Sequence, residues 1–201
     1  MLDSETAKSK RAAAVLQGQR IIVLGACCGF GRSMVRALGA AGAQVVAVDE
    51  SAEALAQIDG GISLMLKGAP EEALRRIGRK WGEARLDNVL NLMPLRHPEK
   101  IDMNVAVLRG VVQGFMPALS ARQGQIVTVA ARPQQPLDVA AGAMVPALVS
   151  AQAAFAHALR RDGLSLNLIS LGEGTVTPAR AVVVGLLARS LGGMTGSELR
   201  L

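Results

Sequence analysis

A glycine-rich turn near the start of the chain constrains the fold more than any other feature. The apolar run Ile21–Leu24 leads into the turn Gly25–Gly31, which opens a helical pattern. A second apolar run, Val45–Val48, ends at Asp49. Strand, glycine turn, helix, strand and acidic residue in this order are typical of a dinucleotide-binding unit.

The chemistry of such a unit gives each residue type a role. Glycines let the backbone approach a pyrophosphate, and the helix N-terminus offers it unpaired N–H groups and the positive end of a dipole. A carboxylate at the end of the second strand can accept hydrogen bonds from an adenosine ribose. Because it would also repel a 2′-phosphate, Asp49 favours NAD over NADP. The residues predicted to form the cradle are Gly25, Cys28, Gly29, Phe30 and Gly31.

The length of 201 residues suits one domain, which we expect over residues 20–201 after a polar arm at 1–19. No uninterrupted run of 18 apolar residues occurs, so no transmembrane segment is predicted. The polar start of the chain is unlike a secretory signal. The two cysteines are adjacent, a pattern that rarely forms a structural disulfide, and we therefore expect a cytoplasmic protein.

The net charge of +6 comes mainly from arginines that are scattered along the chain. Nucleic-acid binding commonly uses stacking aromatics, but the chain has three Phe, one Trp and no Tyr. We therefore predict no nucleic-acid partner. No cluster of His, Cys, Asp or Glu has the spacing of metal ligands, so no metal site is predicted either.

Short β-branched runs alternate with longer helical patterns after the first strand, which predicts a parallel sheet covered on both faces. The expected architecture is a three-layer α/β/α Rossmann fold with a doubly wound, mostly parallel sheet of about seven strands. The predicted strands are 20–24, 44–48, 62–66, 88–92, 125–129, 165–169 and 198–201. The predicted helices are 30–41, 52–56, 71–81, 101–121, 143–161 and 178–191.

Two of these helices, 101–121 and 143–161, are apolar on nearly every side. Such a helix must be covered on nearly every side, and one sheet cannot do that. We therefore expect both helices to face another subunit, and the protein to form an oligomer.

Several single residues have competing interpretations. The thiols of Cys27 and Cys28 lie near a helix N-terminus, where a thiol can become reactive, but small residues in a tight turn are the preferred interpretation. His157 is expected at an interface or in the core, and His97 in solvent. Trp81 closes a helix and is expected to serve packing.

The sequence from Gly18 to Leu201 resembles the short-chain dehydrogenase/reductase family. Gly25, Gly29 and Gly31 match its Gly-x-x-x-Gly-x-Gly turn, and Asp49 stands where the family has its ribose carboxylate. Further fragments resemble the family in the correct order, namely 86–91, 103–105, 124–129, 163–167, 171–172, 177–178 and 194–199. The resemblance implies that Asn91 and Thr177 also contact a cofactor.

The residues of the family's chemistry are missing. The family uses a serine after the fifth strand, then a tyrosine four residues before a lysine on the following helix. These positions fall on Ala131 or Ala130 for the serine, near Ala141 for the tyrosine and near Val145 for the lysine. The chain contains no tyrosine and no lysine after residue 100, and only Asn104, which helps to hold a proton-relay water in the family, remains.

Three further departures concern cofactor and substrate. The turn after the fourth strand, Asn91–Pro94, is bulky where the family has small residues. The aspartate that usually meets the adenine is replaced by Leu66 or Lys67. Almost no insertion follows Thr177, although this segment forms a lid over substrate in active members.

The leading hypothesis is a catalytically inactive family member, a nucleotide-binding or non-catalytic subunit of a homo- or hetero-oligomer. Its partner would be an active relative or another enzyme, and NAD binding is left open. The alternative is an NAD-dependent oxidoreductase for a carbonyl or alcohol that uses an atypical acid, such as water held by Asn104. A third interpretation makes the basic arm a contact to a membrane surface or nucleic acid.

Overall fold

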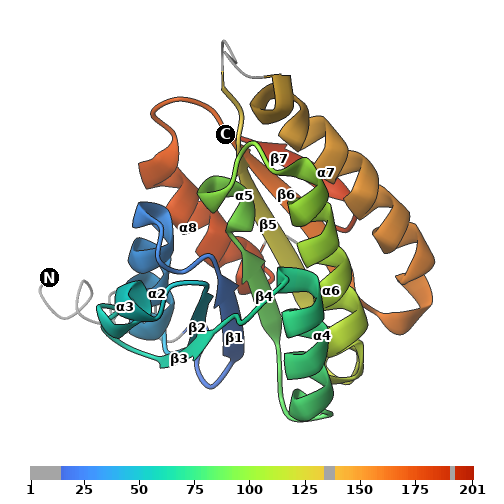
Figure 1. Cartoon of the computed structure of the whole chain (residues 1–201). Coiled ribbons are helices and arrows are strands. Elements are labelled where there is room, and N and C mark those ends of the chain that lie inside the picture. Colours follow the sequence, from blue (N-terminus) through green and yellow to red (C-terminus); the bar gives the residue numbers. More distant parts are fainter. Residues whose placement is uncertain (1–14, 134–138, 191–192) are drawn as a thin grey trace, which may run out of the picture.

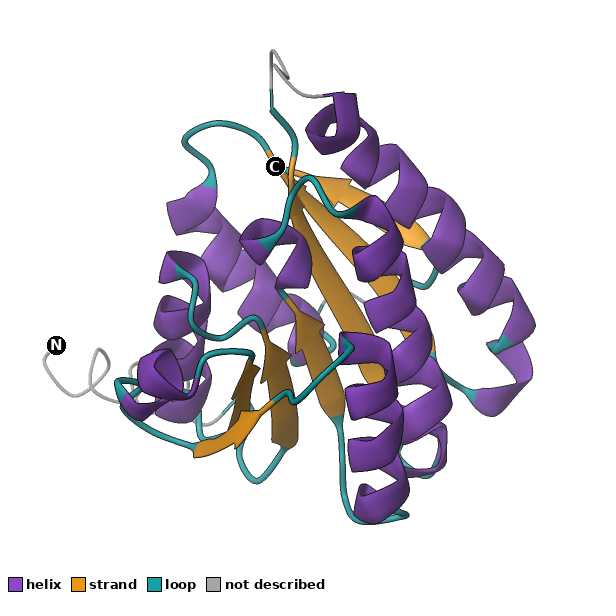
Figure 2. Ribbon diagram, viewed as in Figure 1, coloured by secondary structure: helices purple, strands orange, loops and turns teal. Residues whose placement is uncertain are grey.

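Parallel strands form one twisted sheet between two layers of helices (Figure 1, Figure 2). The computed structural model describes residues 15–133, 139–190 and 193–201. Within these ranges the sheet has seven strands in the order β3-β2-β1-β4-β5-β6-β7. They are β1 (Arg20–Leu24), β2 (Gln44–Asp49), β3 (Ile62–Met65), β4 (Asn88–Asn91), β5 (Gln125–Ala131), β6 (Ser165–Leu171) and β7 (Ser197–Arg200).

The helices divide between the two faces of the sheet, as the doubly wound prediction requires. One face packs against α2 (Gly29–Ala40), α3 (Ala52–Ala56) and α8 (Val176–Leu187). The other packs against α4 (Pro70–Trp81), α6 (Ile101–Ser120) and α7 (Val139–Ala158). The short helix α5 (Met93–Arg96) follows β4, and a 3₁₀ turn (Arg160–Asp162) follows α7.

The predicted elements are present, with shifted ends. Helix α7 begins at Val139 rather than at residue 143. It ends at Ala158 rather than at residue 161, because the chain tightens there into the 3₁₀ turn. Helix α8 ends at Leu187 rather than 191, and Arg189 just beyond it adopts a φ of 58° that a helix cannot continue. Helix α5 was not predicted, because four residues are too few for a periodic pattern.

The predicted arm at 1–19 lies outside the described residues except for its last five. Leu16 in this part is fully buried, and its N–H donates to the carbonyl of Ala41. The packed part of the chain therefore begins before the predicted boundary at residue 20.

The two long apolar helices differ in how the chain itself covers them. Helix α6 lies between α4 and α7 (Figure 1), and its exposed residues include Arg109, Gln113 and Pro117. Its buried apolar residues therefore have partners within the chain, and the expectation that α6 also faces a second subunit stays a prediction. The outer face of α7 remains open, with Val139 86% exposed.

Helix α7 is the one helix among the described residues that is long and apolar enough to cross a membrane, with a mean hydropathy of 1.6. Core helices of water-soluble proteins pass the same test. In this fold α7 packs against β6 and α6 through buried Met144, Leu148 and Gln152.

Glycines set the distance between α4 and α6. A Cβ on Gly78 of α4 would lie 2.2 Å from the carbonyl carbon of Gly114 on α6. A Cβ on Gly110 would lie 2.9 Å from the carbonyl oxygen of Glu71. The two backbones therefore touch, and the ion pair between Glu71 and Arg109 spans the outside of this contact at 2.6 Å.

Candidate dinucleotide-binding cleft

The cleft expected from the sequence lies at the carboxyl ends of β1 and β4. These two strands are neighbours, and the chain winds away from them in opposite directions to β2 and to β5. A reversal of this kind leaves a crevice outside the strand ends, which is where doubly wound sheets bind ligands.

The three motif glycines serve different purposes. Gly25 has a φ of +73°, and a Cβ there would lie 2.9 Å from the backbone of Leu92. A Cβ on Gly31 would lie 2.6 Å from the carbonyl oxygen of Gly25. Gly29 has nothing within 4 Å of its Cβ position and faces open space. The outer glycines therefore serve the turn itself, and Gly29 is the one that gives a ligand access to the backbone.

The start of α2 borders an open cleft of about 510 Å³. Cys28, Gly29 and Phe30 line it, opposite the ends of β5 and β6 at Ala131 and Leu171. The thiol of Cys28 accepts the N–H of Gly31 at 3.2 Å and caps the helix. The structure thus brings the predicted cradle residues together at a helix N-terminus, which suits an anionic group.

Asp49, predicted to hold a ribose, is fully buried and already bonded within the chain. Its Oδ2 accepts the N–H of Cys27 at 2.8 Å, and its Oδ1 accepts the N–H of Glu50 at 2.8 Å. The guanidinium of Arg96 donates to Oδ1 at 3.1 Å. Both oxygens therefore have donors, and ribose hydroxyls have no exposed carboxylate to meet.

Helix α5 supplies this cover. It follows β4 directly, with Leu92 and Met93 fully buried, and so points Arg96 across the end of β2. The next residue, His97, pairs with Glu50 at 2.9 Å. The prediction that His97 lies in solvent is wrong, because only 19% of its side chain is exposed.

Two residues assigned by resemblance lie away from an open site. Asn91 is fully buried, and its Oδ1 accepts the N–H of Met93 in the turn into α5. Thr177 is exposed in the first turn of α8 and is not among the residues that line the cleft. Sequence reasoning missed Arg96 and His97, and the only signal for them was the bulk of the preceding turn.

The positions that the resemblance assigns to the family's serine, tyrosine and lysine carry apolar side chains. Ala131 borders the cleft at the end of β5, and Ala141 and Val145 lie on α7. Asn104 on α6 is fully buried and donates through Nδ2 to the carbonyls of His97 and Lys100, at 2.8 and 2.9 Å. Its Oδ1 has no hydrogen-bond partner in the described part of the chain.

Neither cysteine is activated. Burial, followed by the nearby charge of Asp49, raises the pKa of the Cys27 thiol to about 11. Burial likewise raises the pKa of Cys28. Both thiols are free and stay protonated at neutral pH, which supports their interpretation as small residues in a tight turn.

Within residues 15–133, 139–190 and 193–201, no group of three or more His, Cys, Asp or Glu side chains is arranged to hold a metal ion. His157, expected at an interface or in the core, is exposed on α7, so the core interpretation is wrong.

The parallel sheet, the glycine turn and the cleft at the strand reversal define a Rossmann-type dinucleotide-binding fold. Residues 19–63 match the family model of the short chain dehydrogenases. The matched segment carries the glycine turn and Asp49, and over it the chain is similar to the short chain dehydrogenases. Sequence comparison with curated proteins finds no match.

Solved structures share the fold over nearly the whole chain. A complex of RhlG from Pseudomonas aeruginosa with NADP has a TM-score of 0.79 at 19% identity, covering 94% of this chain and 97% of that chain. The citronellol catabolism dehydrogenase AtuB of Pseudomonas aeruginosa PAO1 has a TM-score of 0.76 at 22% identity, covering 94% and 95%. At these identities the likeness establishes the fold.

Proposed function

We propose that this protein is a catalytically silent short chain dehydrogenase that acts as a non-catalytic subunit. The observation that carries the proposal is the residue type at the three positions that the resemblance assigns to the family's serine, tyrosine and lysine. Ala131 stands at the cleft, and Ala141 and Val145 stand on α7. Loss of a positioned general acid or base alone costs roughly 10²–10⁴ in rate. Neither raised-pKa thiol supplies a substitute at neutral pH.

The residues present fit only part of a nicotinamide dinucleotide. The open cleft at Gly29 and the start of α2 suits a diphosphate, in keeping with the NADP held by the RhlG structure. The adenosine side does not fit, because Asp49 is fully buried beneath Arg96. We therefore expect NADH and NADPH to bind weakly at most.

The subunit role rests on α7. Its outer surface exposes Val139, Pro146, Ala153 and Ala154, together with His157, and no charged residue interrupts the helix. Exposed apolar helix faces of this kind mark surfaces that another protein covers. We propose that α7 pairs with a second copy or with an active relative, in the cytoplasm, where both thiols remain free.

Two measurements on the purified protein test this function. Assays of NADH oxidation with a broad panel of carbonyl compounds should give no turnover above background. Light scattering behind size exclusion should give a dimer or larger species, which Ala153→Glu on the outer face of α7 dissociates. A stable monomer would count against the subunit role, and clear turnover would refute the silent assignment.

One observation favours an enzyme as the alternative. The buried Oδ1 of Asn104 has no partner among the described residues and is free to accept a hydrogen bond from a water. A water held there could deliver a proton, as the family's relay water does. This alternative requires turnover that Asn104→Ala abolishes while NADH affinity is unchanged.

A further inference from the structure

A second cleft, of about 650 Å³, opens on the face of the sheet opposite α2. We name it the β3–α4 cleft, after the two elements that form its walls. Val46 and Leu64 on neighbouring strands form its floor, and Ile77 and Trp81, one helical turn apart on α4, form its side wall. Its volume suits a ligand of small-molecule size.

The cleft exists because α4 is held away from the edge of the sheet. Gly78 and Gly114 bring the backbones of α4 and α6 into contact, so α4 lies over α6 rather than over β2 and β3. Figure 2 shows these two strands facing the viewer without a helix in front of them. Ile62 at the start of β3 is 69% exposed beside this opening. Ile62 and part of Leu64 are therefore open to solvent, whereas Val46 at the base of the cleft is buried.

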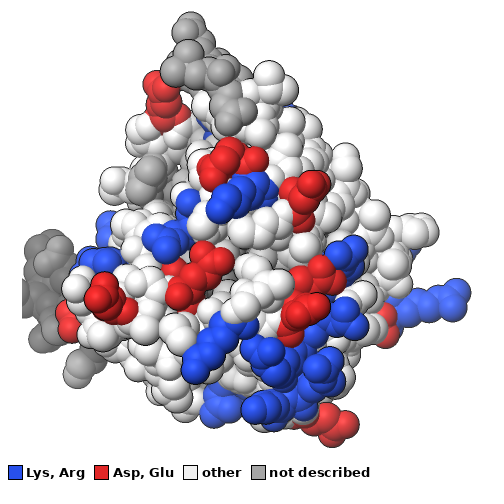
Figure 3. Space-filling view, viewed as in Figure 1, with Lys and Arg blue, Asp and Glu red and all other residues white. Residues whose placement is uncertain are grey.

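Cations surround this apolar floor. Arg20 and Lys67 line the cleft from the strand side, and Arg76 and Lys80 line it from α4. Figure 3 shows Lys and Arg side chains gathered over the lower part of this face. No Asp or Glu is among the described residues that line the cleft.

These cations lack acidic partners within the described ranges. Arg76 donates to the carbonyl of Lys67, and Arg20 donates to the amide oxygen of Gln44. None of the four takes part in an ion pair there, whereas Arg75 on the same helix pairs with Glu71. The residues that line the cleft therefore carry an excess of positive charge, which favours an anion.

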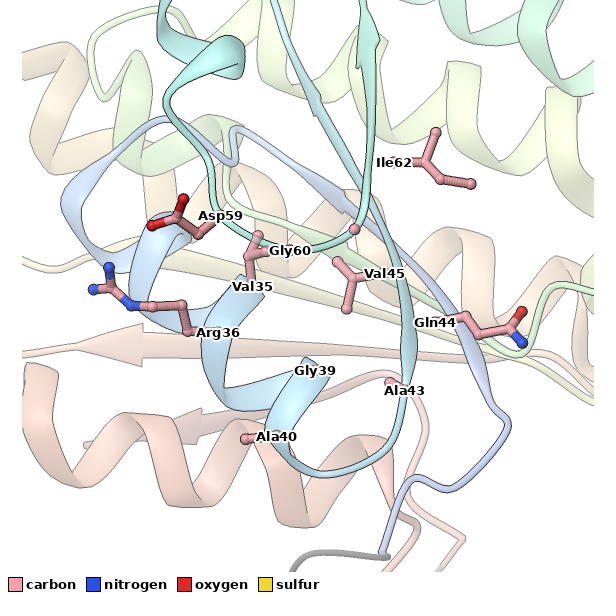
Figure 4. A pocket seen from close by; sticks show the side chains of 11 residues that line it. Val35, Arg36, Gly39, Ala40, Ala43, Gln44, Val45, Asp59, Gly60 and Ile62 are labelled. Atoms are coloured by element: carbon pink, nitrogen blue, oxygen red, sulfur yellow. The ribbon is translucent and has the colours of Figure 1, made fainter.

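A cavity on the other face of the sheet shows the contrast. It measures about 580 Å³ and lies between α2 and the start of β3 (Figure 4). Its walls are mostly apolar, but Arg36 and Asp59 carry opposite charges on the same side of its opening. This cavity therefore has no preference for an anion. The β3–α4 cleft differs because its charged lining residues are all cations.

We propose that the β3–α4 cleft binds a small amphipathic carboxylate. The apolar body lies on Val46, Leu64 and Trp81, and the carboxylate lies at the rim between Lys67 and Lys80. Burial of the apolar body drives binding, and the rim cations select the anionic head over a neutral or cationic one. The site is separate from the dinucleotide cleft and is independent of whether that cleft is occupied.

Trp81 gives the test a local reporter. It is the only tryptophan in a chain without tyrosine, so fluorescence excited at the indole band comes from this cleft alone. Decanoate, titrated below the concentration at which it forms micelles, should change the emission in a saturable way. Decanol and decyltrimethylammonium carry the same apolar chain with a neutral or cationic head. Both should bind at least tenfold more weakly.

Two variants locate the anion. Lys67→Gln combined with Lys80→Gln should weaken decanoate binding roughly tenfold and leave decanol binding unchanged. Both side chains are exposed, so the variant should keep its circular dichroism spectrum. The matched control is Arg79→Gln, which removes a cation from α4 outside the cleft and should leave binding unchanged. Failure of decanoate to saturate the signal, equal binding of the three head groups, or an unaffected double variant would each overturn the proposal.

Discussion

Arg96 and Asp49, distant in the sequence, form an ion pair of 3.1 Å at the carboxyl edge of the sheet. The carboxylate is fully buried, whereas 28% of the arginine side chain is exposed. The pair occupies the position at which a Rossmann fold of this kind presents its acidic residue to a ribose. The short helix α5 therefore makes Asp49 part of a buried ion pair.

Removal of Arg96 should restore access to Asp49. In Arg96→Ala we expect calorimetric titration to show NADH binding at least tenfold tighter than in the unmodified protein, because the carboxylate gains free acceptor positions. NADPH should gain less, since its 2′-phosphate meets the exposed negative charge. The control is His97→Ala, which breaks the neighbouring pair with Glu50 and leaves Asp49 covered. Unchanged NADH affinity would mean that the backbone of α5, not Arg96, closes the site.

The same pair should contribute to stability. Asp49→Asn removes the charge that Arg96 faces and places an amide donor against one of the two backbone N–H groups that the carboxylate accepts. We expect a loss of roughly 2–4 kcal/mol in the free energy of unfolding. Urea denaturation measures it, and the double variant with Arg96→Ala should lose less than the sum of the two single losses. Additive losses would show that the two side chains are not coupled.

The glycine contact between α4 and α6 gives a matched pair of substitutions. Gly78→Ala places a methyl group 2.2 Å from the backbone of Gly114, so it should destabilise the protein by roughly 3 kcal/mol. Gly185→Ala on α8 meets nothing within 4 Å and should stabilise it by about 0.5–1 kcal/mol. Both values come from urea midpoints with an unchanged slope. Equal effects at the two positions would contradict the close approach of the helices.

Stability should fall in alkaline solution through Cys27. Its thiol has a pKa of about 11 in the folded protein, against an ordinary value of 9.0. Between these pH values the unfolded chain loses the proton and the folded protein keeps it, so the folded state binds more protons and unfolding becomes easier as pH rises. Below pH 9.0 this contribution is constant. Cys27→Ala should flatten the decline measured by urea denaturation from pH 9 to 11, and an identical decline in both proteins would refute it.

The sheet was predictable because its signals are local. All seven strands were predicted to within two residues at each end. For the inner strands the signal is a β-branched apolar run, since a buried parallel strand is apolar along most of its length. The turn at Gly25–Gly31 predicted where the first strand ends, where α2 begins and where the cleft lies. Helix α5 escaped prediction, because Met93–Arg96 is too short to show a period and Pro94 also suits a loop.

The sequence by itself determined the Rossmann-type fold, the glycine turn at Gly25–Gly31 and the absence of any tyrosine, since each depends on residue type at a local position. Only the tertiary structure decided whether the Asp49 carboxylate is exposed to a ligand. Arg96 covers it from a helix that is distant in the sequence, and no local sequence pattern predicts that contact. The tertiary structure also decided that α4 leaves the face of β2 and β3 open, since the contact between Gly78 and Gly114 joins two helices distant in the chain. Burial and charge at a site depend on which distant segments the fold brings together, and that is a property of packing.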